Sequence, residues 1–317
     1  MIRILLFMLI PSIVISQDVA VGQWKDYLAY NQPSDICVAK ERVYCVAQGG
    51  LFYYNNDDNS INRISKINGL SDNSIKQIKY NKENERLIIA YDNCNIDILL
   101  DDQITNISDI KRKEINGIKQ INNIYFKENL AYISCSFGLV VLDLIRNEVK
   151  DTYKIGYSGN YKEINQTAII NDLIYVATSE GIYYAEKGNL FLSDFNQWTQ
   201  DTSFNNSNFI NNNFSSINNL NNTPVAIINL ERDSVLIKNN TWDVFSEKAF
   251  NNPNVDEKEF GLFICDSNVI LILDNDFIIT EIESENVISC DALSNNEIWA
   301  ADKKNGLLKY VDGIINR

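Results

Sequence analysis

The run GLFYYNNDDNSINRISKINGLSDNSIKQIKY, residues 50–80, is one copy of a unit that returns along the chain. Short apolar stretches alternate in it with Asn, Asp and Gly, which is typical of strands joined by tight turns. Equivalent apolar stretches surround Tyr44, Ile88, Tyr132 and Tyr175, at intervals of about 44, 44 and 43 residues. A four-stranded propeller blade takes about 40–45 residues. The sequence therefore predicts an all-β fold, a seven-bladed β-propeller of four-stranded antiparallel blades.

The composition agrees with an all-β domain that has a large core. Of 317 residues 45% are hydrophobic, and the chain holds sixteen Tyr, fourteen Phe and only four Pro. Aromatic residues favour strands, and no long stretch shows helical spacing of apolar residues. The net charge of −14 argues against a nucleic-acid partner, because binding to phosphates needs a basic surface.

The strand-like stretches assign the blades. The first blade is predicted from residues 34–39, 42–48, 50–55 and 61–65, and the second from 74–80, 86–91, 95–100 and 104–107. The third is predicted over 118–155, the fourth over 165–200, the fifth over 214–245 and the sixth over 260–282. The seventh starts at Val287 and includes 297–301 and 306–310. Residues 204–213 form an Asn-rich insertion, which we expect to be an exposed loop.

We find no convincing fourth strand in the sequence of the seventh blade before the chain ends, and the N-terminal segment offers one. Residues 23–28 read QWKDYL and resemble the stretches at Trp198 and Trp242, each of which we place at the start of an outer strand. We therefore expect residues 24–27 to pair beside 306–310 and to close the ring, which would leave no open edge. The alternative is that Trp24 only covers one end of the barrel.

The N-terminus has the features of an export signal. Arg3 precedes an apolar stretch at 4–15, and Val14 and Ser16 are small enough for a cleavage site after Ser16. A membrane helix is the alternative, but about 20 apolar residues are needed to span a bilayer. We therefore predict a signal peptide at 1–16 and a propeller domain at 17–317. The mature chain is expected to be exported and to have no integral membrane segment.

The cysteines leave two interpretations open. An exported chain with six Cys invites disulfides, yet all but Cys94 lie in apolar strand stretches, where Cys acts as a small buried hydrophobe. The best candidate pair is Cys37 with Cys45, which would face each other across a turn.

The chain contains no histidine, which removes Ser-His-Asp and Cys-His nucleophilic systems and the commonest transition-metal ligand. Paired carboxylates remain, as in glycosidases. The doublets Asp57-Asp58 and Asp101-Asp102 are the obvious candidates, but both follow strands and fit hairpin turns. Residues 193–198 resemble the Asp-box of sialidases without its glycine, and we interpret them as the start of an outer strand. We predict no catalytic, cofactor-binding or metal-binding residues, and no cofactor.

One position departs from the repeat. Gly50, Gly138 and Gly181 lie between the second and third strands of their blades, where a positive φ is common, and Cys94 takes this place in the second blade. Cys94 is either a reactive thiol in an exposed turn or a drifted turn residue. In the second case Asn93 or Asn95 adopts the left-handed conformation.

Two stretches carry a resemblance to a known family. GQWKDYLAYNQPSDI at 22–36 and GLFYYNNDDNSINRISKINGLSDNSIKQI at 50–78 resemble the N-terminal propeller of the PorZ family of the Bacteroidetes type IX secretion system. The unit GLSDNS at 69–74 is also similar to the repeats of two-component-regulator propellers.

The PorZ resemblance implies a place in a cell-surface attachment complex with the sortase PorU and with PorV. It also implies a role in attaching secreted cargo to anionic lipopolysaccharide, through a C-terminal region with no counterpart in this sequence. We therefore expect an exported, non-catalytic interaction module in the periplasm or at the outer-membrane surface. The alternatives are the periplasmic ligand-sensing propeller of a hybrid two-component regulator, or a carbohydrate-active enzyme.

Overall fold

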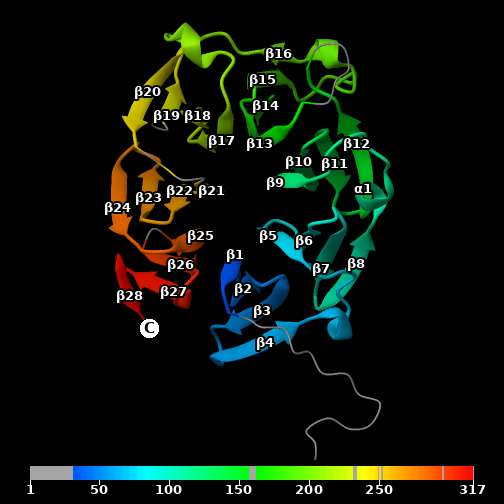
Figure 1. Ribbon diagram of the computed structural model, residues 1–317, viewed down its shortest axis with the longest axis vertical. Coiled ribbons are helices and arrows are strands. Elements are labelled where there is room, and N and C mark those ends of the chain that lie inside the picture. The colour runs from blue at the N-terminus through cyan, green and yellow to red at the C-terminus, as the bar shows by residue number, and fades with distance from the viewer. Residues whose placement is uncertain are drawn as a thin grey trace, which may run out of the picture.

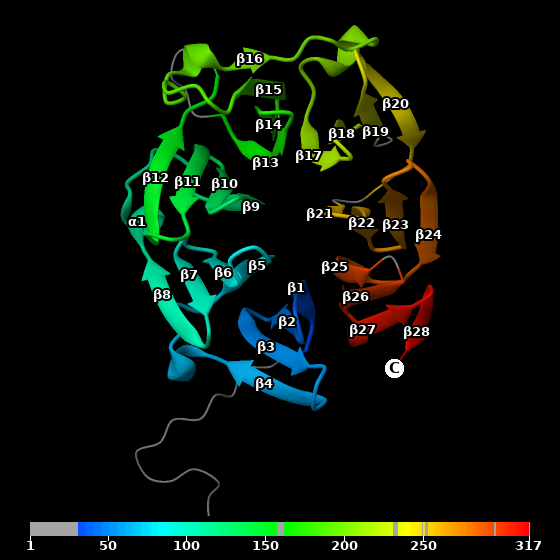
Figure 2. The ribbon, with the colours of Figure 1, turned by 180° about the vertical axis from the view of Figure 1, so that it is seen from behind.

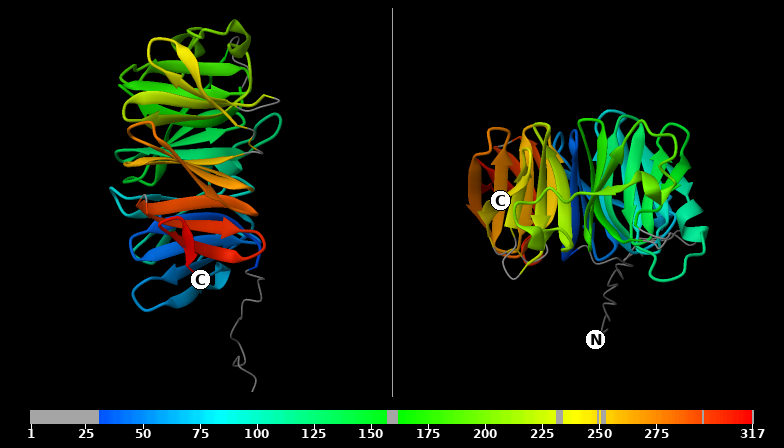
Figure 3. Two further views of the ribbon diagram at one scale, coloured as in Figure 1. Left: turned by 90° about the vertical axis from the view of Figure 1, so that its left-hand side faces the viewer. Right: turned by 90° about the horizontal axis from the view of Figure 1, so that it is seen from above.

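A computed structural model describes residues 31–156, 162–230, 234–248, 250, 253–294 and 296–316. These described residues form seven antiparallel sheets of four strands each, arranged as a ring of blades (Figure 1, and from behind in Figure 2). Side views show a disc whose strands run between its two faces (Figure 3). The predicted seven-bladed propeller of four-stranded antiparallel blades is confirmed.

The first four blades follow the chain in order. Blade 1 contains β1 (Pro33–Ala39), β2 (Arg42–Ala47), β3 (Gly50–Asn55) and β4 (Ser60–Ile64). Blade 2 contains β5 (Ile75–Asn81), β6 (Arg86–Tyr91), β7 (Ile96–Leu100) and β8 (Gln103–Ile107). Blade 3 contains β9 (Ile121–Lys127), β10 (Leu130–Cys135), β11 (Gly138–Asp143) and β12 (Glu148–Tyr153). Blade 4 contains β13 (Ile164–Ile170), β14 (Leu173–Thr178), β15 (Gly181–Glu186) and β16 (Thr199–Gln200).

The remaining three blades complete the ring. Blade 5 contains β17 (Phe214–Leu220), β18 (Thr223–Ile228), β19 (Ser234–Lys238) and β20 (Trp242–Glu247). Blade 6 contains β21 (Asn254–Lys258), β22 (Gly261–Asp266), β23 (Val269–Asp274) and β24 (Ile279–Glu283). Blade 7 contains β25 (Val287–Ser294), β26 (Glu297–Asp302), β27 (Gly306–Val311) and β28 (Ile314–Asn316). Short helical turns are α1 (Asp109–Arg112), η1 (Lys66–Asn68), η3 (Phe195–Gln197) and η4 (Ser207–Phe209).

The core is divided among the contacts between neighbouring blades. Each contact holds its own cluster of buried apolar side chains, as between blades 2 and 3, where Ile88 and Ile98 pack with Ile124 and Ile133. The contact between blades 7 and 1 is built in the same way, around Val38 and Trp299. Fully burying such a side chain is worth about 1.5–3 kcal/mol. The second strands are the most apolar, which is why the repeat anchors were found in β2, β6, β10 and β14.

A β-bulge recurs in the first strand of six blades. The pairing register shifts between Pro33 and Asp35, Ile75 and Gln77, Ile121 and Asn123, Ile164 and Gln166, Phe214 and Ser216, and Val287 and Ser289. A bulge re-aims the side chain that follows it. Five of the six residues after the bulge, all but Ser216, line the central cavity described below.

The seventh blade is completed differently from the prediction. β28 pairs with β27 through Tyr310 and Ile315, so the C-terminal residues supply the fourth strand. The inference that this strand was missing is therefore wrong. The predicted strand at 24–27, like the predicted signal peptide at 1–16, lies outside the described residues. Within those residues, no helix is long and apolar enough to cross a membrane.

Two other expectations about the blades need correction. Blade 6 begins at Asn254 and not at Phe260, because β21 was not recognised as a strand. The Asn-rich insertion is not wholly an exposed loop. Phe204 is buried and stacks on Trp242, with 5.7 Å between ring centroids.

The cysteine pair expected from the sequence is wrong. Cys37 lies opposite Tyr44 in the ladder, so the side chains of Cys37 and Cys45 point to opposite faces of the sheet, and both are free. Cys265 of β22 and Cys290 of β25 form a disulfide instead, with 6.1 Å between their Cα atoms. This bond ties blade 6 to blade 7.

Both interpretations of Cys94 also fail. Cys94 itself has the positive φ, of 62°. The left-handed conformation is therefore not adopted by Asn93 or Asn95 in its place. Its side chain is fully buried beside Ile121 and Cys135, and burial raises the pKa of its thiol. Packing in the core between blades 2 and 3 therefore stabilises Cys94 in a backbone conformation that glycine adopts most easily.

The disulfide should contribute measurably to stability. Its two cysteines are 25 residues apart, a loop for which cross-linking stabilises the folded state by about 3 kcal/mol. Replacing both Cys265 and Cys290 by Ala should lower the free energy of unfolding by that order in chemical denaturation. A matched Cys45→Ala variant controls for the loss of a buried thiol. Six reactive thiols in the unfolded, unreduced chain, instead of the four expected, would contradict the disulfide.

Candidate functional site

The first strands of the blades line a polar cavity at the centre of the ring. It measures about 180 Å³, and β1, β5, β9, β13, β21 and β25 contribute to its wall. A wider cavity of about 490 Å³ shares Tyr80, Tyr125, Phe126, Glu257 and Lys258 with it. This wider cavity, which we call the channel mouth, is bordered by the turns between first and second strands at 82–83, 128, 221–222 and 259.

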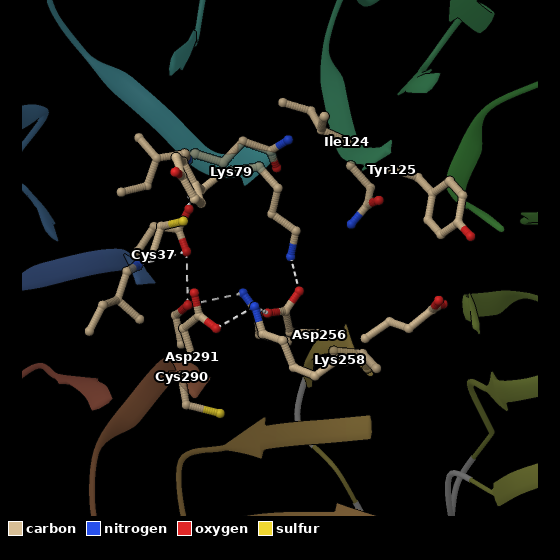
Figure 4. A pocket seen from close by; sticks show the side chains of 18 of the residues that line it. Cys37, Lys79, Ile124, Tyr125, Asp256, Lys258, Cys290 and Asp291 are labelled. Carbon is tan, nitrogen blue, oxygen red and sulfur yellow. Dashed lines mark hydrogen bonds and ion pairs between the residues drawn. The ribbon is translucent and has the colours of Figure 1, made fainter. Parts of the chain in front are cut away.

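Two lysines and two aspartates form an ion-pair cluster across the central cavity (Figure 4). Lys79 of β5 contacts Asp256 of β21. Lys258 Nζ lies 2.7 Å from Asp256 and 2.5 Å from Asp291 of β25. Burying charges is costly unless they are paired, and in this cluster two positive charges match two negative ones.

Asp35 and Asp291 also bind backbone N–H groups that face the channel. Asp35 of β1 accepts hydrogen bonds from Ile36 N at 2.9 Å, from Ile78 N of blade 2 at 2.8 Å and from Ser289 Oγ of blade 7 at 2.8 Å. Asp291 of blade 7 accepts from Val38 N of blade 1 at 2.6 Å and from Ala292 N at 2.7 Å. These two carboxylates therefore bind blade 1 to both of its neighbours.

Glu257 is the least satisfied carboxylate of the channel. Asn219 N of blade 5 donates to its Oε2 at 2.8 Å, and this is the one hydrogen bond it receives from the described residues. An ionised carboxylate can accept about four. Glu257 is largely buried and lines both the central cavity and the channel mouth.

The environment changes the pKa values of these groups in opposite directions. Burial raises the pKa of Asp35 to about 6, although the hydrogen bonds from Ile78 and Ser289 oppose it. Burial also raises the pKa of Glu257 to about 7, against the Asn219 N–H and the charges of Lys79 and Lys127. Asp35 and Glu257 therefore hold their protons more tightly than exposed carboxyls do.

Two of the ion-paired groups, Asp256 and Lys258, behave differently, whereas burial raises the pKa of Asp291 despite its contact with Lys258. Burial acts to raise the pKa of Asp256, but Lys258 and Lys79 hold it below its usual range. Burial acts to lower the pKa of Lys258, but Asp256 and Asp291 raise it above its ordinary value. Both groups therefore stay charged at neutral pH.

The carboxylate doublets noted in the sequence lie elsewhere. Asp57-Asp58 occupies the turn between β3 and β4, and Asp101-Asp102 the turn between β7 and β8. Asp102 pairs with Arg42 at 2.6 Å, near the outer rim. The stretch 193–198 leads into the outer strand β16 as expected, and Trp198 donates its indole N–H to Leu192 O at 3.0 Å.

Sequence reasoning missed the polar cluster, because half of it lies in β21, whose sequence NVDEK reads as a loop. One signal was present. A polar residue followed by an aliphatic one, in Asp35-Ile36, Gln77-Ile78 and Asn123-Ile124, recurs in Asn254-Val255. Among the described residues no three His, Cys, Asp or Glu side chains are placed to hold a metal ion.

Residues 43–199 match the family model of the PorZ N-terminal β-propeller domain of the type IX secretion system. In a comparison with solved structures, the chain is similar to PorZ of Porphyromonas gingivalis, described as an essential bacterial surface component of that system. The identity is 22% and the TM-score 0.78, over 90% of this chain and 37% of that chain. The chain thus spans little more than a third of the PorZ structure.

Two further structures share the propeller architecture at low identity. Sqt1 of Saccharomyces cerevisiae is 9% identical, with a TM-score of 0.58 over 91% of this chain and 85% of that one. A chain of the mitotic checkpoint complex is 10% identical, with a TM-score of 0.63 over 92% and 99%. These two show the fold alone. A comparison with curated protein sequences gives no match.

Removing Asp256 should destabilise the ring strongly. Asp256→Ala removes a buried carboxylate, which leaves the half-buried Lys79 without its partner and Lys258 with one carboxylate. Breaking a buried pair costs about 3–5 kcal/mol. Glu259→Ala is the matched control, because Glu259 pairs with Lys82 at the exposed surface, where a pair is worth about 0–1 kcal/mol. Chemical denaturation measures both, and equal effects would show that the cluster contributes no more than a surface pair.

Stability should depend on pH through Glu257. Its pKa is about 7 in the folded chain and about 4.3 when unfolded, so the folded state binds the proton more tightly. The contribution of Glu257 to stability is therefore largest below pH 4 and is lost as the pH rises to 7. Glu257→Gln removes this loss. Its free energy of unfolding, relative to the unmodified chain, should rise by about 3 kcal/mol between pH 4 and pH 8.

The exposed Glu83→Gln serves as the control for that titration. A difference between Glu257→Gln and the unmodified chain that does not change with pH would contradict the tight proton binding of Glu257.

Proposed function

The chain is a PorZ-like β-propeller, and we propose that it acts as a non-catalytic interaction module of the type IX secretion system. It would assist the attachment of secreted cargo to anionic lipopolysaccharide, together with a sortase of the PorU type and with PorV. The observation that carries this proposal is the match of residues 43–199 to the PorZ propeller. The PorZ-like fold over 90% of the chain supports it.

An exported location follows from the same proposal. The export signal expected at 1–16, with a mature domain from residue 17, agrees with a component of the periplasm or the outer-membrane surface. The disulfide between Cys265 and Cys290 supports it too, since disulfides persist in oxidising compartments outside the cytoplasm.

The arrangement of the channel carboxylates supports a non-catalytic role. A glycosidase needs two carboxyl groups free to act on a sugar bound between them. Asp256 and Asp291 do converge, but both contact the ammonium of Lys258, which lies between them. Asp35 is engaged by three hydrogen-bond donors. Among the described carboxylates of the central cavity this leaves Glu257 for the enzyme alternative, and one carboxyl is not a pair.

Purification of the tagged full chain from its own cells tests the proposal. We expect PorU-type and PorV-type proteins to co-purify with it, and we expect no hydrolysis of glycan or peptide substrates. A complex without those components would remove the assignment to type IX secretion. Glycan turnover that is lost in Glu257→Gln would contradict the non-catalytic role.

A further inference from the structure

The channel mouth contains one largely buried carboxylate, that of Glu257, whose charge and hydrogen-bonding capacity the described residues leave unmatched. Lys79 and Lys258 are balanced by Asp256 and Asp291. Glu257 remains, with one backbone hydrogen bond to its Oε2. Asp35 and Asp291, which have comparable positions in the channel, each receive three donors.

A second acceptor in the same wall also lacks a donor. Asn219 lines the channel mouth, and its Oδ1 is buried and receives no hydrogen bond from the described residues. Its backbone N–H is the group that donates to Glu257. Two residues that are joined by a hydrogen bond therefore present unmatched acceptors and one carboxylate charge, which calls for a cationic donor.

The lysines at the mouth do not supply this donor. Lys82 lies 3.2 Å from Glu259, at the outer border of the cavity. Lys258, the next residue after Glu257, is held by Asp256 of its own strand and by Asp291 of blade 7. Lys127 is exposed, and its charge acts on Glu257 without a direct ion pair among the contacts of the described residues.

We propose that the channel mouth binds the ammonium group of a lysine side chain, inserted by a loop of a partner protein beside Glu257 and Asn219. An ammonium offers three donors around one charge, whereas a guanidinium prefers to bind both oxygens of a carboxylate. Asn219 N already uses one lone pair of Glu257 Oε2, which leaves less of that oxygen for a bidentate guanidinium and favours the ammonium. The mouth, of about 490 Å³, has room for one extended side chain and the tip of its loop. The proposal names the contact site of the interaction module and rests on that proposed function.

The binding site can be tested without any partner. N-acetyl-lysine methylamide is the probe, and N-acetyl-norleucine methylamide is its uncharged counterpart. The amide N–H resonance of Asn219 in the full chain reports binding, because this group donates to Glu257. We expect a saturable shift with the lysine probe at pH 8, and none with the norleucine probe. An arginine probe should bind at least several-fold more weakly. Glycine methylamide carries a free α-amino group and shows whether the N-terminus of a chain binds in place of a lysine side chain.

Variants distinguish a specific binding site at Glu257 from a general electrostatic attraction of cations to the acidic surface. Glu257→Gln should weaken the lysine probe at least tenfold, and the exposed Glu83→Gln at the same mouth should not. Lys127→Gln should strengthen binding, because it removes a nearby positive charge. Equal shifts from both probes, or unchanged binding in Glu257→Gln, would overturn the proposal.

Contact with a lysine of a partner protein is tested by chemical cross-linking of the complexes that co-purify with the chain. A carbodiimide joins a carboxylate to a contacting amine with loss of water, which the reagent takes up as its urea. We expect an amide bond between Glu257 and a partner lysine, and several-fold less complex with Glu257→Gln than with Glu83→Gln. Complexes that form equally well with Glu257→Gln would refute the inference and leave the proposed function intact. A bound lysine probe with no recovered complex would remove the proposed function and keep the cation site.

Discussion

The first strand of every blade has an unpaired edge that faces the centre of the ring, and its backbone N–H groups need acceptors. Carboxylates supply acceptors for such groups in blades 1, 2, 5 and 7. Asp35 binds the N–H groups of Ile36 and Ile78, and Asp291 binds that of Val38. Because these bonds cross from one blade to the next, the groups that satisfy the inner edges also hold blade 1 between blades 7 and 2. Recurrent bulges in these strands place polar side chains where they are needed.

This use of the carboxylates limits what the channel can do. Carboxylates that bind backbone N–H groups and buried lysines have little capacity left for a substrate. Glu257 differs because it binds one backbone N–H and faces the wider cavity. The residue that contributes least to joining the blades is therefore the one on which the proposed partner contact rests. A rigid ring with one open polar site is the arrangement that the proposed interaction module requires.

The blades were predictable because their second strands are apolar and their turns are rich in Asn, Asp and Gly. Strand β21 was missed because Asp256, Glu257 and Lys258 are polar. Their partners lie on other blades and are not visible in the sequence. The Cys265–Cys290 pair depends on two blades meeting, which spacing along the chain does not reveal. The positive φ of Cys94 likewise reflects packing against blade 3 and not local preference.

Amide hydrogen exchange at Val38 tests most directly whether channel carboxylates hold the ring together. Val38 lies on the inner strand β1, and its N–H has Asp291 as its acceptor. Cys45 of β2, which is paired on both sides, serves as the internal reference. If Asp291 closes the ring, Val38 should exchange as slowly as Cys45 in the unmodified chain and much faster in Asp291→Ala. Rapid exchange of Val38 in the unmodified chain, beside a protected Cys45, would contradict closure by this carboxylate.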